Sequence, residues 1–315
     1  MIIQKVDHER ADNFLVNNFS SPTHWSDWNL IVSRYYHTNF FYLGAFENNE
    51  LIGIYPVHET KTKSGYLNNW YSGQYKNIPN GGWIFCKKNK IGLDQLPSRW
   101  KLMHRTFTLP EIPDFNVEYV NHKNNSGATL IIDLTEEIDN IWKNSLHSKR
   151  RNMVRKASKS DIITREAKTN DDLNEFYKIY KETSQRNGLN IMPYEIFLEL
   201  FNATPNIKLT ILMAFKQNIQ IANVAVISDK NYSLYWLGNS GENVKNEGQG
   251  ELLQWQIINL MKQSGCKYYD LCHISPKKLP NIYLFKKGFS DKEYPVRIFI
   301  KKPFYYKALR KITND

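Results

Sequence analysis

The chain has 315 residues, of which 41% are hydrophobic and 14% aromatic, and its formal net charge is +11 at pH 7. This composition excludes a disordered chain, and the length favours two domains over a single core. The three cysteines, Cys86, Cys266 and Cys272, are too few for a disulfide framework, and we expect packing roles for Cys266 and Cys272. The positive charge favours a polyanionic partner, such as nucleic acid, a phosphate or an acidic membrane surface.

The N-terminal sequence does not have the pattern of a secretory signal. Acidic residues occur within the first ten positions, and no long apolar core follows them. No apolar run approaches the roughly 18 residues that a membrane helix needs. We therefore expect a cytoplasmic protein.

The first part of the chain predicts two helices followed by a hairpin. Residues 7–18 and 24–34 place apolar side chains at helical spacing, with Phe14 and Trp28 among them. Residues 40–46 and 51–57 are rich in strand-forming residues, and the intervening Glu-Asn-Asn-Glu sequence is typical of a turn.

Residues 68–82 combine asparagine and glycine with tryptophan and tyrosine. Aromatic faces stack on sugars and peptides, so we expect this loop, through Trp70, Tyr71 and Tyr75, to bind a sugar or a peptide. The alternative is a turn packed on the domain surface.

A helix is expected over residues 95–105, and the polar, glycine-ended stretch 121–127 marks a domain boundary. We therefore assign residues 1–125 to an N-terminal domain and residues 126–315 to a C-terminal domain. A strand is predicted for residues 128–134.

Residues 148–159 read SKRRNMVRKASK and predict a strongly basic helix. Between positions 143 and 160 there are seven lysines and arginines and no acid. Arg151, Arg155 and Lys159 follow one another at i, i+4 and i+8 and so share one stripe. Because neighbouring like charges repel, this stripe favours a phosphate-bearing partner, although a solvated face is the alternative.

The remainder of the C-terminal domain predicts an alternation of strands and helices. We expect strands at 161–167, 207–215, 220–227, 232–237, 267–271 and 294–300, and helices at 135–142, 171–186, 193–202, 251–263 and 303–312. A glycine-containing loop, 238–250, precedes the helix at 251–263. The free N–H groups of a helix N-terminus suit an anion or a developing oxyanion.

Two family resemblances converge on this loop and the residues after it. KNEGQG, at 245–250, resembles the pyrophosphate loop of GNAT acyltransferases, with Lys245 in place of the usual glutamine or arginine. LLQWQI (252–257), GCKYYDL (265–271) and LFKKGF (284–289) resemble, in order and spacing, the Fem family of peptidoglycan-bridge aminoacyltransferases. The run from Arg151-Asn152 to Arg155-Lys156-Ala157 resembles the start of the second domain in that family.

The resemblance implies an α/β (α+β) fold of tandem GNAT-like domains, each a mixed, largely antiparallel sheet flanked by helices. It implies that Lys286, after Phe285, stabilises the tetrahedral intermediate and the leaving group. Asp270 is a candidate base, with a turn-forming role as the alternative. We assign the remaining positions to the donor (Lys245, Gly248, Gln249, Gly250, Arg151, Arg155 and Lys159) and to the acceptor (Trp236 and Asn239, with the loop aromatics).

Three functions are compatible with these features. The first is a Fem-like acyltransferase that moves an aminoacyl group from aminoacyl-tRNA to an amine of a phosphate-bearing peptidoglycan or polysaccharide precursor. The second is an acetyl- or acyl-CoA-dependent N-acyltransferase acting on an amino sugar. The third is a non-catalytic protein that binds RNA or an anionic membrane surface. We expect no metal and no cofactor apart from the donor substrate.

Overall fold

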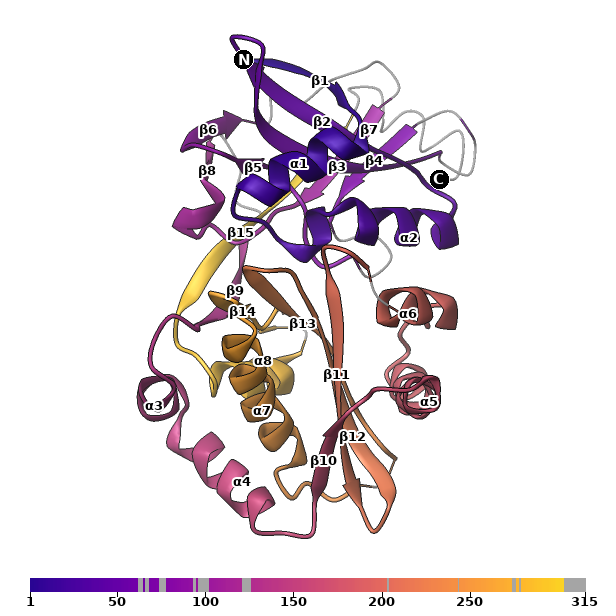
Figure 1. Cartoon of the computed structure of the whole chain (residues 1–315), viewed down its shortest axis with the longest axis vertical. Helices are drawn as coiled ribbons and strands as arrows, with labels where there is room; N and C mark the ends of the chain where they lie inside the picture. The colour runs from indigo at the N-terminus through magenta and orange to yellow at the C-terminus, as the bar shows by residue number, and fades with distance from the viewer. Residues whose placement is uncertain are drawn as a thin grey trace. The chain divides into compact units, whose positions relative to one another are not determined.

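The computed structural model describes residues 1–61, 65, 68–73, 78–92, 95, 102–120, 126–202, 204–242, 244–273, 276–277 and 279–302. The chain forms two compact units (Figure 1). Unit 1 comprises Met1–Ala128 and Tyr294–Asp315, and unit 2 comprises Thr129–Glu293. Residues 294–302 were expected in the C-terminal domain, but they lie in unit 1 because β15 (Glu293–Lys301) pairs with β7 (Leu102–Phe107). The expected helix 303–312 lies outside the described residues.

Unit 1 is a largely antiparallel sheet with helices on it. Its strands run in the order β1-β2-β3-β4-β7-β15, and all neighbours are antiparallel except β4 and β7. The other elements of this unit are β1 (Ile2–Val6), α1 (His8–Asn17), η1 (Pro22–His24), α2 (Ser26–Tyr36), β2 (Asn39–Glu47), β3 (Glu50–Lys61), β4 (Asn68–Ser72), β5 (Ile84–Phe85), β6 (Asn89–Gly92), η3 (Pro113–Phe115) and β8 (Val117–Val120).

Local sequence explains most of unit 1. The two predicted helices and the predicted hairpin are confirmed, and Asp7 caps α1 by accepting a hydrogen bond from the Arg10 N–H. Asn48 and Asn49 both have positive φ, as a tight two-residue hairpin requires. The helix expected at 95–105 is wrong for its last residues, which form β7. Pairing with β4 on one side and β15 on the other satisfies the β7 backbone and overrides local helix preference.

Unit 2 repeats the strand pattern of unit 1. Its order is β10-β11-β12-β13-β14-β9, and only β13 and β14 are parallel. Both units therefore have the predicted class of fold, a mixed and largely antiparallel sheet flanked by helices. The elements of unit 2 are β9 (Ser126–Asp133), α3 (Ile138–Asn140), the π-helix η4 (Ile141–Ser145), α4 (Ser148–Ser158), β10 (Ile163–Glu166), α5 (Asn170–Arg186), α6 (Tyr194–Phe201), β11 (Lys208–Lys216), β12 (Ile219–Ser228), β13 (Tyr232–Ser240), α7 (Gln249–Gln263), β14 (Tyr268–Asp270) and α8 (Pro280–Lys287).

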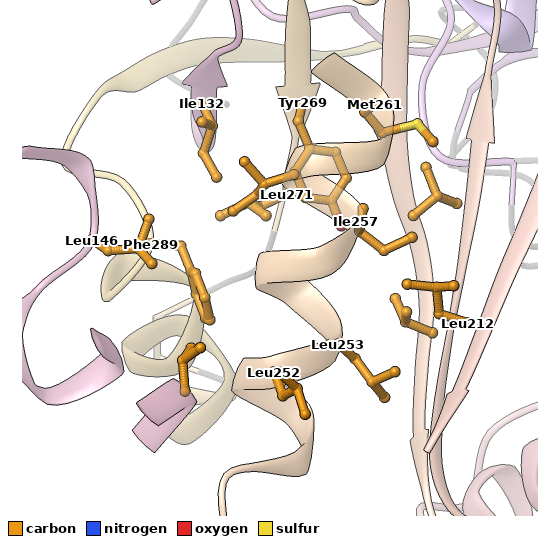
Figure 2. Close-up of a cluster of buried hydrophobic side chains, with 14 of the residues drawn as sticks. Ile132, Leu146, Leu212, Leu252, Leu253, Ile257, Met261, Tyr269, Leu271 and Phe289 are labelled. Atoms are coloured by element: carbon orange, nitrogen blue, oxygen red, sulfur yellow. The ribbon is translucent and has the colours of Figure 1, made fainter. Parts of the chain in front are cut away.

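Helix α7 covers one face of the unit 2 sheet, and α5 and α6 cover the other (Figure 1). Leu253, Ile257 and Met261 of α7 belong to the same buried cluster as Leu212 of β11 (Figure 2). On the opposite face, Phe176 packs against Phe197. In the described part of the chain, no helix is both long enough and apolar enough to cross a bilayer.

Candidate active site

The parallel strand pair of the unit 2 sheet is short. β13 and β14 pair over only three positions, from Tyr232 opposite Tyr268 to Leu234 opposite Asp270. β13 then continues to Ser240, whereas β14 has ended. The register with β12 shifts at this point and leaves Trp236 as an extra residue in β13. Such bulges bend a strand and redirect its side chains next to active sites.

Lys286, in α8, is almost entirely buried, with 7% of its surface exposed. Its Nζ donates a hydrogen bond to the Cys272 carbonyl oxygen at 3.1 Å and lies 5.2 Å from the centre of the Tyr235 ring. Among the described residues, that carbonyl oxygen is its one hydrogen-bond acceptor. Burial lowers the pKa of Lys286 from its usual value of 10.5. Its neighbour Lys287 is the surface lysine, since it forms ion pairs with Asp291 and Glu293.

Asp270 organises the turn that carries Cys272. Its carboxylate accepts hydrogen bonds from Thr129 Oγ1 at 2.5 Å, the Tyr232 hydroxyl at 2.8 Å and the Cys272 N–H at 2.7 Å. Burial raises the pKa of this carboxyl group. Cys272 has a φ of 58°, which an L-residue adopts only when its surroundings impose it. The Asp270 side chain therefore holds the strained turn whose carbonyl oxygen faces Lys286.

Cys266 and Cys272 have the protonated thiols expected of packing residues. Burial raises the pKa of the Cys272 thiol, and it raises the pKa of Cys266 to about 12. Both thiols therefore stay protonated near neutral pH, which is the unreactive form.

The loop before α7 packs closely against α4. Gly248 caps α7 with a φ of 96°, and a Cβ there would lie 2.4 Å from the Met153 carbonyl oxygen in α4. Gln249 folds back on the loop, with Oε1 accepting from the Glu247 N–H and Nε2 donating to the Lys245 carbonyl oxygen. Lys245 itself is exposed.

Backbone N–H groups of this loop are bonded to the loop's own side chains. The Gly248 N–H donates to Asn246 Oδ1 at 3.0 Å, and the Glu247 N–H is held by Gln249. The first helical hydrogen bond runs from the Leu252 N–H to the Gly248 carbonyl oxygen, so the N–H groups of residues 249–251 precede the helical ladder.

Arg150 connects α4, α7 and α8, and the sequence analysis missed it. Its guanidinium forms a 2.6 Å ion pair with Glu251, whose side chain is 3% exposed, and donates a hydrogen bond to the Leu284 carbonyl oxygen. It also lies 4.8 Å from the centre of the Phe285 ring. A Cβ on Gly288 would lie 2.4 Å from its Nε. The signal in the sequence is Glu251, an acid at the start of the helix predicted for residues 251–263.

The predicted basic helix is confirmed as α4, but its stripe divides into two kinds of residue. Arg151 donates to the carbonyl oxygens of Lys143, at 2.9 Å, and Leu146, and thereby holds the preceding π-helix. Arg155 and Lys159 are exposed, and the Arg155 guanidinium lies 5.4 Å from the centre of the Trp142 ring.

The residues predicted to bind the acceptor are spread over both units. In unit 1, Trp70 is buried in β4 and donates to Glu59 Oε1 at 2.8 Å, and Tyr71 lies under the Arg105 guanidinium. Tyr75 lies outside the described residues. In unit 2, Trp236 lies 5.2 Å from Phe197 between ring centres.

Asn239, the last predicted acceptor residue, donates to Asn223 Oδ1 at 2.7 Å. It borders a cavity of about 160 Å³ between β13 and the start of α7. Tyr235, Gln254 and Phe285 line the same cavity. Tyr235 and Gln254 were not identified from the sequence, because nothing local marks a strand tyrosine or a helix glutamine as a site residue.

Comparison with known proteins agrees with this architecture. The FemAB family model matches residues 115–215. The crystal structure of FemX superposes with a TM-score of 0.68 at 13% identity and covers 100% of both chains. The C-terminal domain of a putative lysylphosphatidylglycerol synthetase from Agrobacterium fabrum gives a TM-score of 0.58 at 11% identity, covering 97% of this chain and 95% of that one.

A tandem GNAT protein from the clavulanic acid biosynthesis pathway gives a TM-score of 0.51 at 8% identity, covering 96% of this chain and 99% of that one. No curated protein matches the sequence. The predicted resemblance to the Fem family and to tandem GNAT-like domains is confirmed.

Proposed function

We propose that this enzyme transfers an aminoacyl group from aminoacyl-tRNA to an amine of a phosphate-bearing peptidoglycan or polysaccharide precursor. The observation that carries the proposal is the buried Lys286 ammonium, held by the Cys272 carbonyl oxygen just after the end of β14. The FemAB match and the similarity to FemX and to a putative lysylphosphatidylglycerol synthetase support the choice of an aminoacyl group.

The reaction requires charge stabilisation at an oxygen atom. The acceptor nitrogen attacks the ester carbonyl carbon, a C–N bond forms, and the C–O bond to the tRNA ribose breaks. The amine loses a proton and the ribose oxygen gains one, so the products are an amide and an uncharged tRNA. Lys286 offsets the negative charge on the carbonyl oxygen or the departing ribose oxygen, and a fixed cation in a water-poor site does so efficiently.

Asp270 has a positioning role in this scheme. Three donors already hold its carboxylate, and its hydrogen bond to the Cys272 N–H fixes the carbonyl oxygen that orients Lys286. Phe285 packs against Arg150 and so fixes the helix that carries Lys286. The scheme uses only the two substrates, so the absence of a separate cofactor stays a prediction.

The exposed cations of α4 would bind the tRNA phosphates. Lys149, Arg155, Lys156 and Lys159 project from a helix that contains no acid. Arg151 instead supports this surface from within, through its bonds to backbone carbonyl groups. Aminoacyl-tRNA is present in the cytoplasm, so a cytoplasmic location is part of the proposal, as is peripheral contact with an anionic membrane that carries the acceptor.

The second candidate is an N-acyltransferase that uses acetyl- or acyl-CoA and acts on an amino sugar. The KNEGQG loop and the fold shared with a tandem GNAT protein favour it. Against it, the loop N–H groups of Glu247 and Gly248 are bonded to side chains of the same loop. The pyrophosphate of CoA would have to displace these hydrogen bonds. Lys245 and Gly250 would then contact the acyl donor.

Binding of the two donor classes distinguishes the candidates. The purified protein is tested for retention of a charged tRNA pool on filters, at two salt concentrations, and for a thermal shift with acetyl-CoA. We expect saturable, salt-sensitive retention of charged tRNA and no shift with acetyl-CoA. A clear shift with acetyl-CoA and no retention of tRNA would overturn the aminoacyl-tRNA proposal in favour of the second candidate.

A further inference from the structure

The cavity between β13 and α7 is large enough to bind part of a substrate. Its volume is about 160 Å³. A protein cavity of about 150 Å³ binds benzene, so this space, which is partly open to solvent, has room for roughly six non-hydrogen atoms. Gly250, in the first turn of α7, and Phe285, next to Lys286, both line it.

The wall of the cavity offers no partner for a charge. Among its lining residues there is no aspartate, glutamate, lysine, arginine or histidine. Its polar groups already bond to one another or to neighbours, because Gln254 Oε1 accepts from the Tyr269 hydroxyl at 2.8 Å and Gln254 also hydrogen-bonds to Tyr235. Ala222, Val224 and Leu253 supply apolar surface.

Gly238 and Gly250 shape this space in different ways. A Cβ on Gly238 would lie 1.9 Å from the Tyr235 hydroxyl oxygen, so the tyrosine side chain occupies the place of a side chain at position 238. At Gly250 a Cβ would meet only the Phe285 ring, at 3.8 Å, which is an ordinary contact distance. Alanine can therefore replace Gly250 without a clash, and its methyl group would narrow the cavity near the Phe285 ring.

We propose that this cavity holds the side chain of the amino acid being transferred and that it selects an uncharged side chain of up to about six non-hydrogen atoms. Tyr235 joins the two parts of the site, since its ring lines the cavity and lies 5.2 Å from Lys286 Nζ. The carbonyl group of the donor lies at Lys286 and its side chain enters the cavity. A charged side chain would lose its hydration there without gaining a partner. This inference rests on the proposed use of aminoacyl-tRNA.

The test uses one tRNA transcript that carries, through a stable 3′ amide, glycine, norleucine or lysine. Norleucine and lysine have the same four-carbon chain and differ in the ammonium group alone. We expect the wild-type enzyme to bind the norleucyl form at least tenfold more tightly than the lysyl form. Gly250→Ala should weaken binding of the norleucyl form by roughly tenfold and leave the glycyl form unchanged, as a methyl group in a substrate pocket typically does.

Asn259→Ala is the matched control, because it also places an alanine in α7 but on the opposite side of the helix. It should leave all three affinities unchanged. Equal binding of the norleucyl and lysyl forms, with no effect of Gly250→Ala, would overturn the side-chain cavity while tRNA binding persists. If no acylated form binds more tightly than the uncharged transcript, the proposed function itself fails.

Discussion

The two sheets share one strand pattern but differ at their parallel strand pair. In unit 1, β4 and β7 stay paired over five positions, from Asn68 opposite Leu102 to Ser72 opposite Thr106. In unit 2, β13 and β14 pair over three and then separate. After β4 the chain reaches β5, which pairs with β3, and Trp83 packs against Tyr55 and Phe85. After β13 the chain instead forms α7. The same strand order is therefore followed by a further paired strand in unit 1 and by a helix in unit 2.

The two units also differ in the kind of ionisable group that they bury. Burial lowers the pKa of His24 to about 4 and those of His58 and His104 to about 3, so these unit 1 histidines are neutral packing residues. Lysine 286 and Asp270 of unit 2 are also buried, but each lies in the electrostatic field of the other. A neutral imidazole can be buried cheaply, whereas a buried ammonium needs partners and is typical of a functional site.

The largest expected effect concerns the ion pairs of the two units. Glu251→Ala leaves the Arg150 guanidinium buried without its carboxylate, which should cost about 3–5 kcal/mol of unfolding free energy. Glu111→Ala removes the partner of Arg297 in unit 1, where both side chains are about one-fifth exposed, and should cost about 1 kcal/mol. Urea denaturation followed by circular dichroism measures both, and equal losses would contradict the distinction.

Lys286→Ala should lower turnover by about 10²–10³-fold, the usual cost of removing one group that stabilises an oxyanion. The matched control is Lys287→Ala, which removes a half-buried, ion-paired lysine from the same helix and should leave turnover nearly unchanged. Single-turnover kinetics with saturating donor and acceptor separates this effect from binding. Unchanged turnover in Lys286→Ala would remove the lysine from the mechanism.

The same lysine sets the alkaline limit of activity. Because its folded pKa is lowered, the ammonium should lose its proton below pH 10.5, and turnover should fall as the pH rises through that lowered value. Lys286→Arg keeps its charge at alkaline pH, so any residual activity of that variant should lack this decline.

Unit 1 should dominate the loss of stability in acid. The folded pKa of His58 is about 3, against 6.5 for the free side chain, so the unfolded chain binds the additional proton between these values. The contribution of His58 to the unfolding free energy is therefore complete above pH 6.5. Between pH 6.5 and about pH 3 this contribution falls by about 1.4 kcal/mol per pH unit as the pH decreases. His58→Gln should remove that part of the slope of unfolding free energy against pH. An unchanged slope would show that His58 does not titrate on unfolding.

The smallest effect should be the one on tRNA binding by surface charge. A triple variant in which alanine replaces Arg155, Lys156 and Lys159 should have a slope of log affinity against log salt that is smaller by about 2. Each phosphate contact contributes roughly 0.7–0.9 to this slope. Lys61, Lys88 and Lys90→Ala removes the same charge from unit 1 and serves as the control. Equal slopes for the two variants would make α4 an ordinary solvated face.

The sequence predicted the local elements of both units well. The helices α1, α2, α4, α5, α6 and α7 and the hairpin at Asn48 and Asn49 follow from apolar spacing and turn residues. Hydrophobic periodicity encodes each of these within a few turns of chain, so no distant partner is needed to identify them. The three short motifs at 252–257, 265–271 and 284–289 likewise carried the resemblance to the Fem family.

Tertiary structure alone decided how the distant parts combine. β7 is a strand because β4 and β15, far from it in sequence, pair with its two edges. Lys286 is buried and Lys287 is only half-buried because of the way α8 packs, with Phe285 against Arg150. Two neighbouring lysines in the sequence do not reveal which of them will be buried. Arg150 forms an ion pair with Glu251, which lies 101 residues later in the sequence. Such contacts depend on three-dimensional proximity, whereas sequence periodicity reports only which face of an element is buried.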